Sequence, residues 1–180
     1  MNQIELHKAI SEKLNGSDRT IILTIDGPAG AGKTTLAQEI SAAFPDSEVI
    51  HMDDLYRGWL LTLGPTLTRE LQSILDQLNE SEDISYGKFD WAENKVGYFH
   101  SFKTPTLLIL EGVGAGQEAI AQSVDISVWV DIPIPVGLER VLKRDGESIA
   151  SQMELFLLDQ EAYFTAELPQ ERAAFQISGN

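Results

Sequence analysis

The sequence predicts an α/β fold, in which a parallel β-sheet carries helices on both faces and a β-hairpin is inserted. Three observations predict it. Apolar runs of strand length alternate with amphipathic helical patterns, a glycine-rich loop joins the first apolar run to a helix, and one aromatic-rich segment interrupts the alternation. Strands that alternate with helices form parallel sheets, because the connecting helices cover the faces of the sheet.

The elements follow from hydrophobic spacing and from residues that end helices. Apolar residues three and four positions apart indicate helices, whereas short continuous apolar runs indicate buried strands. Gly16 and Pro45 end the first two helices, because glycine favours a helix C-terminus and proline cannot continue a helix. The sequence predicts helices over residues 4–14, 34–44, 67–78, 135–144 and 148–168, and strands over residues 20–25, 48–51, 106–110 and 126–130.

Residues 84–100 break this alternation. Two aromatic-rich runs, 84–91 and 96–100, flank the polar turn Ala92-Glu-Asn-Lys95, a pattern typical of a β-hairpin. We therefore predict an inserted hairpin within residues 81–104. Two interpretations stay open, an excursion that closes the fold or a flap on the substrate side, since inserted loops often carry binding residues. We expect residues 1–180 to form one domain.

Composition argues against several classes of function. The 180 residues carry a formal net charge of −15 with a pI near 4.4, which repels nucleic-acid phosphates and anionic lipid. The absence of cysteine excludes disulfides and thiolate catalysis. The N-terminus lacks the apolar core of a signal peptide, and no apolar run approaches the ~20 residues of a membrane-spanning helix. We expect a cytoplasmic protein that binds neither nucleic acid nor membrane, as a monomer or a homodimer.

A phosphate-binding loop is the strongest motif. The pattern G-x-x-x-x-G-K-[ST] occurs as Gly27-Pro-Ala-Gly-Ala-Gly-Lys-Thr34, between a predicted strand and a predicted helix. Glycines let backbone N–H groups surround phosphate oxygens, and the helix N-terminus adds partial positive charge. We expect Lys33 to reach the β- and γ-phosphates of ATP, and the Thr34 hydroxyl to bind Mg²⁺. The candidate nucleotide-binding residues are Gly27, Pro28, Ala29, Gly30, Ala31, Gly32, Lys33, Thr34 and Thr35.

Carboxylates at predicted strand ends point to the reaction centre. Asp53 follows the second strand, where a parallel sheet opens its active-site crevice, and it can orient an acceptor hydroxyl and take its proton. The alternative is that Asp53 and Asp54 cap the next helix. Glu111 ends an apolar strand and can reach Mg²⁺ or a substrate hydroxyl, unless it is a surface carboxylate. The candidate metal ligands are Thr34, Asp53 and Glu111.

Basic residues concentrate on the helix predicted within residues 135–146. Arg140, Lys143 and Arg144 lie three and four positions apart, so their side chains can converge on one face. We interpret this helix as a lid whose arginines neutralise the transferred phosphoryl group. The alternative is a solvated basic face paired with Glu139 and Asp145. The candidate catalytic residues are Lys33, Asp53, Arg140 and Arg144.

Other classes of P-loop protein fit less well. The guanine-selective N-K-x-D motif is absent, because Asn94-Lys95 is followed by Val96-Gly97. The chain also lacks room for the helical subdomain of ring-forming ATPases. A P-loop alone leaves open a kinase, a nucleotide-driven switch or an inert nucleotide binder. The remaining motifs favour a kinase that acts on a small-molecule acceptor.

The motifs together resemble the uridine kinase and phosphoribulokinase branch of P-loop kinases. The P-loop run over 26–37, Met52-Asp-Asp-Leu-Tyr-Arg57 and Ile109-Leu-Glu-Gly112 have the order and spacing of that branch, over residues 21–145. The resemblance implies ATP- and Mg²⁺-dependent transfer of the γ-phosphoryl group to a hydroxyl of a nucleoside-like acceptor. It also implies that Asp53 is the base and that the arginines of the predicted lid close over the phosphates.

The same resemblance assigns the acceptor side of the site. It implies that Tyr56 lies beside the acceptor, that the hairpin closes over the nucleoside, and that Asp90 contacts the ribose. Trp91-Ala-Glu-Asn follows Asp90 where uridine kinases have a His-Pro-containing stretch, so the branch is inferred and the acceptor is not. A nucleoside-monophosphate, pantothenate-type or other metabolite kinase, or a non-catalytic ATP-binding module, stays open. The candidate substrate residues are Asp53, Tyr56, Arg57, Asp90 and Glu111.

Overall fold

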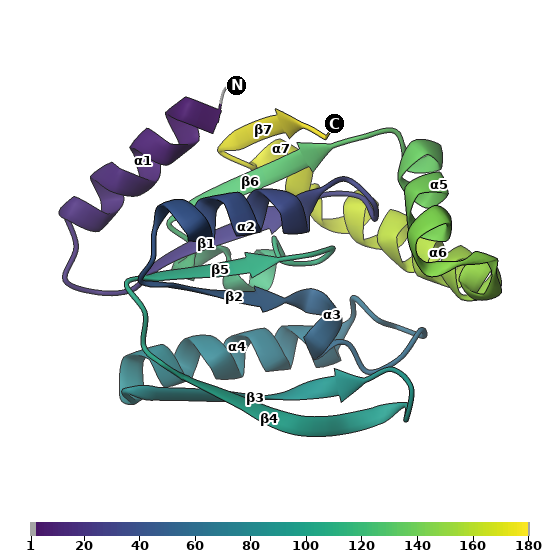
Figure 1. The fold of residues 1–180 in the computed structure, drawn as a ribbon, viewed down its shortest axis with the longest axis horizontal. Helices are drawn as coiled ribbons and strands as arrows, with labels where there is room; N and C mark the ends of the chain where they lie inside the picture. The colour runs from purple at the N-terminus through teal and green to yellow at the C-terminus, as the bar shows by residue number, and fades with distance from the viewer. Residues whose placement is uncertain (1–2, 180) are drawn as a thin grey trace.

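The computed structural model describes residues 3–179. In chain order the elements are α1 (Gln3–Asn15), β1 (Ile21–Asp26), α2 (Lys33–Ala43), β2 (Ser47–His51), α3 (Met52–Leu55), α4 (Pro65–Glu80), β3 (Asp83–Asp90), β4 (Lys95–Lys103), β5 (Leu107–Glu111), the 3₁₀ helix η1 (Glu118–Ser123), β6 (Ile126–Asp131), α5 (Ile134–Asp145), the 3₁₀ helix η2 (Glu147–Ile149), α6 (Ala150–Glu167), α7 (Pro169–Arg172) and β7 (Phe175–Ser178). Five strands form a parallel sheet in the order β2-β5-β1-β6-β7, and β3 and β4 form an antiparallel hairpin (Figure 1).

Helices cover both faces of the sheet, as the sequence predicts. Successive side chains of a strand point to opposite faces, so Leu23 of β1 packs in the cluster completed by α1 and α2. Ile22 packs in the cluster completed by α4 and α6. In Figure 1, α1 and α2 lie on one side of the sheet and α4 lies on the other. β1 is buried along its whole length, which is expected of a strand between two helical layers.

The carboxyl ends of three neighbouring strands bring the predicted motifs together. Ile25 of β1 lies opposite Glu111 of β5, and His51 of β2 lies opposite Glu111 on the other side. The loop over residues 27–32 follows β1, and α3, which carries Asp53, follows β2 directly. Parallel strands end at the same edge of a sheet, so the P-loop (residues 27–34), α3 and the end of β5 meet there.

The predicted hairpin lies between α4 and β5, and Figure 1 shows it alongside α4. Its turn comes one residue earlier than predicted, because β3 ends at Asp90 and β4 begins at Lys95. The Asp90 Oδ1 atom accepts hydrogen bonds from the N–H groups of Ala92 and Glu93, both at 3.0 Å, and these bonds close the turn. Trp91 therefore belongs to the turn and not to the strand.

Some short elements lie outside the predicted pattern. The helix α3 has four residues and η1 has six, too few to show a helical period in the sequence. They pack by few apolar side chains, which lie in the core: Met52 and Leu55 in α3 and Ile120 in η1. Within the described residues, no helix is both long enough and apolar enough to cross a membrane.

Candidate active site

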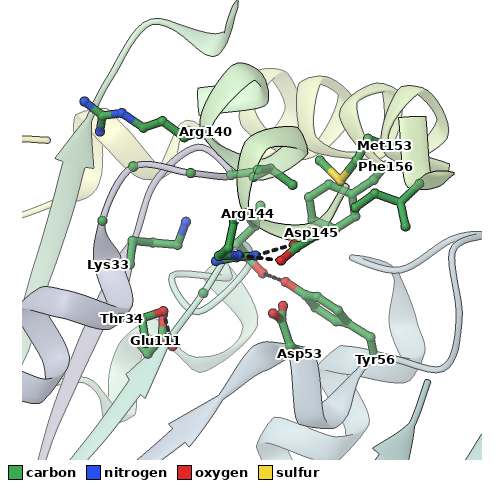
Figure 2. Close-up of a pocket in the computed structure, with 18 of the residues that line it drawn as sticks. Lys33, Thr34, Asp53, Tyr56, Glu111, Arg140, Arg144, Asp145, Met153 and Phe156 are labelled. Carbon is green, nitrogen blue, oxygen red and sulfur yellow. Dashed lines mark hydrogen bonds and ion pairs between the residues drawn. The ribbon is translucent and has the colours of Figure 1, made fainter. Parts of the chain in front are cut away.

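A cavity of about 620 Å³ opens at the carboxyl end of the sheet, between the P-loop, α3, the hairpin turn, α5 and α6 (Figure 2). This volume is typical of a site that holds a small molecule. The cavity brings together most of the residues that the sequence singles out. Those that line it are Ala29, Gly30, Ala31, Gly32, Lys33, Thr34, Thr35, Asp53, Tyr56, Glu111, Arg140 and Arg144.

The P-loop is packed against α5 by two glycines. Gly30 has a φ of +74°, and a Cβ atom there would lie 2.2 Å from the carbonyl oxygen of Gly137. A Cβ atom on Gly137 would lie 2.1 Å from the carbonyl oxygen of Ala29. Both distances are far below a van der Waals contact, so only glycines allow this approach of the two backbones. The first turns of the predicted lid helix therefore rest directly on the phosphate-binding loop.

Lys33 lies across the P-loop. Its Nζ atom donates hydrogen bonds to the carbonyl oxygens of Gly27, at 2.8 Å, and Pro28, at 2.7 Å. Gly27 and Pro28 thus contact Lys33 instead of lining the cavity. Burial lowers the pKa of Lys33, and the nearby carboxylates of Asp26 and Glu111 oppose this shift. The flexible side chain can exchange these carbonyl oxygens for phosphate oxygens, which form stronger, charge-assisted hydrogen bonds.

Thr34 and Glu111 form an oxygen-rich edge of the cavity. The Thr34 hydroxyl donates a 3.0 Å hydrogen bond to Glu111 Oε1, and His51 Nδ1 is hydrogen bonded to the same oxygen. This bond raises the pKa of His51, although burial opposes the shift. No group of three or more His, Cys, Asp or Glu side chains in residues 3–179 forms a metal site. Mg²⁺ fits these residues, because it takes few protein oxygens and completes its shell with phosphates and water.

Asp53 lies in the first turn of α3. The N-cap position of α3 is His51, so neither Asp53 nor Asp54 caps this helix, and Asp54 instead pairs with Lys88 at 2.8 Å. The Asp53 side chain is exposed in the open cavity. The cavity walls displace water from its carboxyl group and raise its pKa, the Glu111 carboxylate adds to this shift, and Lys33 opposes it. Asp53 therefore has the features of a carboxylate that can accept a proton.

The two predicted lid arginines differ in placement. Figure 2 shows Arg144 in the middle of the cavity, between Lys33 and Asp53, whereas the guanidinium group of Arg140 extends away from them. Arg144 donates two hydrogen bonds of 2.7 Å to the carboxylate of Asp145. The ion pair expected of a solvated basic face is thus present, but it lies inside the cavity. Lys143 does not line the cavity.

An aromatic wall closes the end of the cavity opposite the P-loop. Tyr56 is buried, donates a 2.7 Å hydrogen bond to the carbonyl oxygen of Val113, and packs against Phe156 with ring centroids 5.9 Å apart. Trp91 contacts Trp59, with centroids 4.8 Å apart, and its Nε1 atom donates a 3.1 Å hydrogen bond to the Asp53 carbonyl oxygen. We call Tyr56, Trp59, Trp91 and Phe156 the aromatic wall. Figure 2 shows Tyr56 and Phe156 across the cavity from Lys33.

Two predicted substrate residues lie elsewhere. Asp90 does not line the cavity, because its carboxylate is engaged in the hairpin turn. Arg57 also does not line the cavity, since its guanidinium group forms a 3.0 Å ion pair with Glu70 of α4. The structure brings Trp59, Trp91 and Phe156 to the cavity instead. Their signal in the sequence is ambiguous, because aromatic residues at such positions serve equally as core.

The buried Asp26, the last residue of β1, forms a further cluster behind the P-loop. Its Oδ1 atom accepts hydrogen bonds from the N–H groups of Gly27, at 2.6 Å, and Gly114, at 3.2 Å. Its Oδ2 atom accepts from the Gly116 N–H, at 2.9 Å, and the Tyr163 hydroxyl, at 2.7 Å. Burial raises the pKa of Asp26, and the hydrogen bonds from Tyr163, Gly116 and Gly27 counteract the shift. Sequence reasoning gave this residue no role.

Several known proteins are similar to this chain in sequence. Cytidylate kinase from Haloquadratum walsbyi is 29% identical over 134 residues, which cover 74% of this chain and 64% of that protein. Uridine kinase from Borrelia turicatae is 24% identical over 168 residues, which cover 76% of this chain and 74% of that protein. Inorganic pyrophosphatase TTM2 from Arabidopsis thaliana is 28% identical over 146 residues, which cover 77% of this chain. The chain spans only 22% of the length of this last relative.

Solved structures and a family match agree with the fold. A possible uridine kinase from Bacillus stearothermophilus has a TM-score of 0.64 at 20% identity, with 96% of this chain and 99% of the other covered. A candidate fructose transport system kinase from Silicibacter has a TM-score of 0.73 at 20% identity, with 98% of each chain covered. The NB-ARC domain family matches residues 3–113, more than half of the chain. The chain therefore belongs to the NB-ARC family of P-loop NTPase domains and has the fold of the uridine kinase-like P-loop kinases.

Proposed function

We propose that the protein transfers the γ-phosphoryl group of ATP to a hydroxyl group of a small, uncharged, nucleoside-like acceptor. One observation carries the proposal. A single cavity has a P-loop with Lys33 at one end, Asp53 and the aromatic wall at the other, and Arg144 between them. Phosphoryl transfer depends mainly on positioning and on electrostatic stabilisation, and this arrangement supplies both.

In the proposed reaction each side chain acts on a stated atom. Lys33 and the P-loop N–H groups hold the phosphates, and Asp53 orients the acceptor hydroxyl and takes its proton. The acceptor oxygen then forms a bond to the γ-phosphorus atom, the bond from this phosphorus to the β–γ bridging oxygen breaks, and ADP leaves. Arg144 stabilises the charge on the transferred group. Thr34 and Glu111 would hold Mg²⁺, which neutralises phosphate charge when it is bound.

The charge distribution supports an uncharged acceptor. A phosphate or carboxylate on the acceptor needs a free cation close to it. Lys88 forms an ion pair with Asp54 at 2.8 Å, and Arg57 is occupied by Glu70. Among the described residues, the cations that line the cavity are Lys33, Arg140 and Arg144, all from the P-loop and the lid helix. An uncharged acceptor is therefore favoured over a nucleoside monophosphate or pantothenate.

The aromatic wall supports an acceptor with a flat body. The rings of Trp59 and Trp91 are partly exposed and offer faces and edges on which an aromatic or sugar ring can stack. The buried Tyr56 packs against Trp91. Gln152 adds a polar group, because its Oε1 atom is buried without a hydrogen-bond partner in the described structure. A buried, unpaired amide oxygen costs about 1–3 kcal/mol, so an acceptor that donates a hydrogen bond to it gains specificity.

An acceptor panel tests the proposal. The protein is incubated with Mg²⁺-ATP and with nucleosides, nucleoside monophosphates, pantothenate or sugars, and acceptor-dependent ADP release is measured for wild type and Asp53→Asn. We expect a response to an uncharged acceptor that the variant loses. A preference for a monophosphate contradicts the uncharged acceptor. ATP binding with no ADP release from any acceptor supports a non-catalytic nucleotide-binding module instead.

A further inference from the structure

Helix α6 holds the P-loop at two points that the proposed chemistry does not use. The Oε1 atom of Gln160 accepts a 2.9 Å hydrogen bond from the N–H group of Ala29 in the P-loop. The hydroxyl of Tyr163 donates a 2.7 Å hydrogen bond to Asp26, directly before the P-loop. Gln160 is fully buried and Tyr163 is nearly so. Both contacts join residues more than 130 positions apart in the sequence.

The hydrogen bond from Tyr163 to Asp26 is the more important of the two contacts, because the Asp26 carboxylate is buried. A buried carboxylate needs hydrogen-bond donors, since it has lost its water. The donors to Asp26 come from the P-loop, the loop after β5, and α6. Of these, only Tyr163 donates from a side chain. Asp26 therefore fixes the relative positions of three segments, and the Tyr163 hydroxyl is the part of this cluster that a substitution can remove without changing a backbone.

A P-loop binds phosphate through N–H groups that must all point toward one centre. Holding the loop in that shape before the nucleotide arrives removes an ordering cost from binding. Gln160 fixes the peptide between Pro28 and Ala29, and Asp26 fixes the first N–H group of the loop. The carbonyl groups of Gly27 and Pro28 face Lys33, so they take no part in these contacts with α6.

We infer that Gln160 and Tyr163 are positioning residues of the nucleotide site, which hold the P-loop in its phosphate-binding shape through Ala29 and Asp26. The same helix lines the acceptor end of the cavity with Met153 and Phe156. Helix α6 thus contacts both ends of the site. This inference rests on the proposed binding of nucleotide at the P-loop.

Binding of Mg²⁺-ADP, measured by titration calorimetry, tests the inference. We expect the dissociation constant to rise about tenfold in Tyr163→Phe and in Gln160→Leu, because each substitution removes one buried hydrogen bond that orders the loop. Gln77→Leu is the matched control, since Gln77 makes two comparable hydrogen bonds to Ser85 on the hairpin, outside the cavity. Gln77→Leu is expected to lower the melting temperature and to leave the dissociation constant within twofold of wild type.

Amide hydrogen exchange over residues 27–34 gives a readout that a general loss of stability does not reproduce. We expect faster exchange there in both α6 variants, with the Ala29 N–H group most affected by Gln160→Leu, and no change in Gln77→Leu. Unchanged nucleotide affinity and unchanged exchange in Tyr163→Phe and Gln160→Leu would overturn the inference, while nucleotide binding by the P-loop would stand. Failure of the wild-type protein to bind Mg²⁺-ADP would overturn the proposed function itself.

Discussion

The hydroxyl of Thr34 and the carboxylate of Glu111 are joined by a 3.0 Å hydrogen bond, although they lie 77 positions apart in the sequence. They meet because β1 and β5 are neighbours in a parallel sheet, so the segments that follow both strands share one edge. The pair puts a hydroxyl oxygen and carboxylate oxygens beside the phosphate-binding loop. Oxygen atoms of these types are the ligands that Mg²⁺ prefers.

Glu111→Gln tests the metal assignment. The substitution keeps the shape of the side chain and removes a negative charge, so we expect the Mg²⁺ concentration that gives half-maximal ADP release to rise about tenfold or more. Activity is measured against Mg²⁺ at fixed ATP. Glu80→Gln, at the exposed end of α4, is the control and should leave the Mg²⁺ dependence unchanged. The same dependence in Glu111→Gln as in wild type would contradict a role at the metal.

Lys33→Met should abolish tight nucleotide binding. Lys33 is the buried cation of the P-loop, and its loss removes charge-assisted hydrogen bonds to phosphate oxygens, so we expect affinity for Mg²⁺-ATP to fall about 100-fold. Titration calorimetry measures the change. The exposed Lys8→Met is the control for loss of one positive charge. Retained affinity in Lys33→Met would rule out the P-loop assignment.

Asp53→Asn should separate catalysis from binding. An amide cannot accept the acceptor proton, so turnover is expected to fall by about 10²–10⁴-fold while affinity for Mg²⁺-ATP stays within about threefold. Asp54→Asn is the matched control, because the Asp54 carboxylate is next in the sequence but pairs with Lys88 and does not line the cavity. Turnover is measured with the acceptor that the panel identifies. Equal turnover in Asp53→Asn and wild type would reduce Asp53 to a structural residue of α3.

The pH dependence of kcat/KM reports on the same carboxylate. The cavity walls, which displace water from the carboxyl group, and the Glu111 carboxylate raise the pKa of Asp53. Only the deprotonated form accepts a proton, so activity should fall on acidification at a pH above the usual aspartate value of about 4. The positive charge of Arg144 lowers this pKa. The acidic limb should therefore move to higher pH in Arg144→Leu. A limb that stays in place or moves to lower pH would contradict the assignment of this limb to Asp53.

Asp125 gives a prediction about stability. Burial alone would raise its pKa, but hydrogen bonds from Arg19, at 2.6 and 2.9 Å, and from the Ile22 N–H group lower it overall. A carboxyl group whose pKa is lower in the folded than in the unfolded state stabilises the protein at pH values above its unfolded-state pKa of about 3.9. This contribution is lost as the pH falls through the folded-state pKa. Arg19→Ala should therefore lower the free energy of unfolding by about 1 kcal/mol at pH 7, given the exposure of Arg19.

Urea unfolding of wild type and Arg19→Ala at about pH 7 and pH 3 measures this difference. The difference should shrink at the lower pH, because protonation of the Asp125 carboxylate weakens its pair with Arg19. Lys8→Ala, which removes an exposed pair with Glu12, should have a smaller effect at both pH values. A difference that grows on acidification would contradict the role given to Asp125.

Sequence reasoning predicted the parts of the site that local patterns encode. Each of these parts can be recognised from a few consecutive residues. They are the P-loop motif, the strand before it, and the acids at the ends of two other strands. The parallel topology then brings Asp53 and Glu111 together, because parallel strands end at one edge. The residues of the P-loop therefore follow from a motif, and the acids follow from a motif combined with a fold class.

The rest of the site depends on tertiary contacts, which a few consecutive residues do not reveal. Asp90 and Trp91 are adjacent, yet the turn N–H groups engage the Asp90 carboxylate and leave Trp91 in the cavity wall. Met153 and Phe156 have the spacing of an ordinary buried helix face, and only the position of α6 places them in the cavity. Asp26 accepts a hydrogen bond from Tyr163, which lies 137 positions away in the sequence. The acceptor end was therefore less predictable than the nucleotide end.

The contact between Gly30 and Gly137 restricts how this chain can change by substitution. Alanine in the interior of a helix usually stabilises it by up to about 1 kcal/mol relative to glycine, so α5 taken alone would gain from Gly137→Ala. In the folded chain the added methyl group would lie 2.1 Å from the Ala29 carbonyl oxygen and push the helix away from the loop. A helix from another protein that replaced α5 would therefore need a glycine at this point, so the P-loop and α5 can be exchanged only as a matched pair.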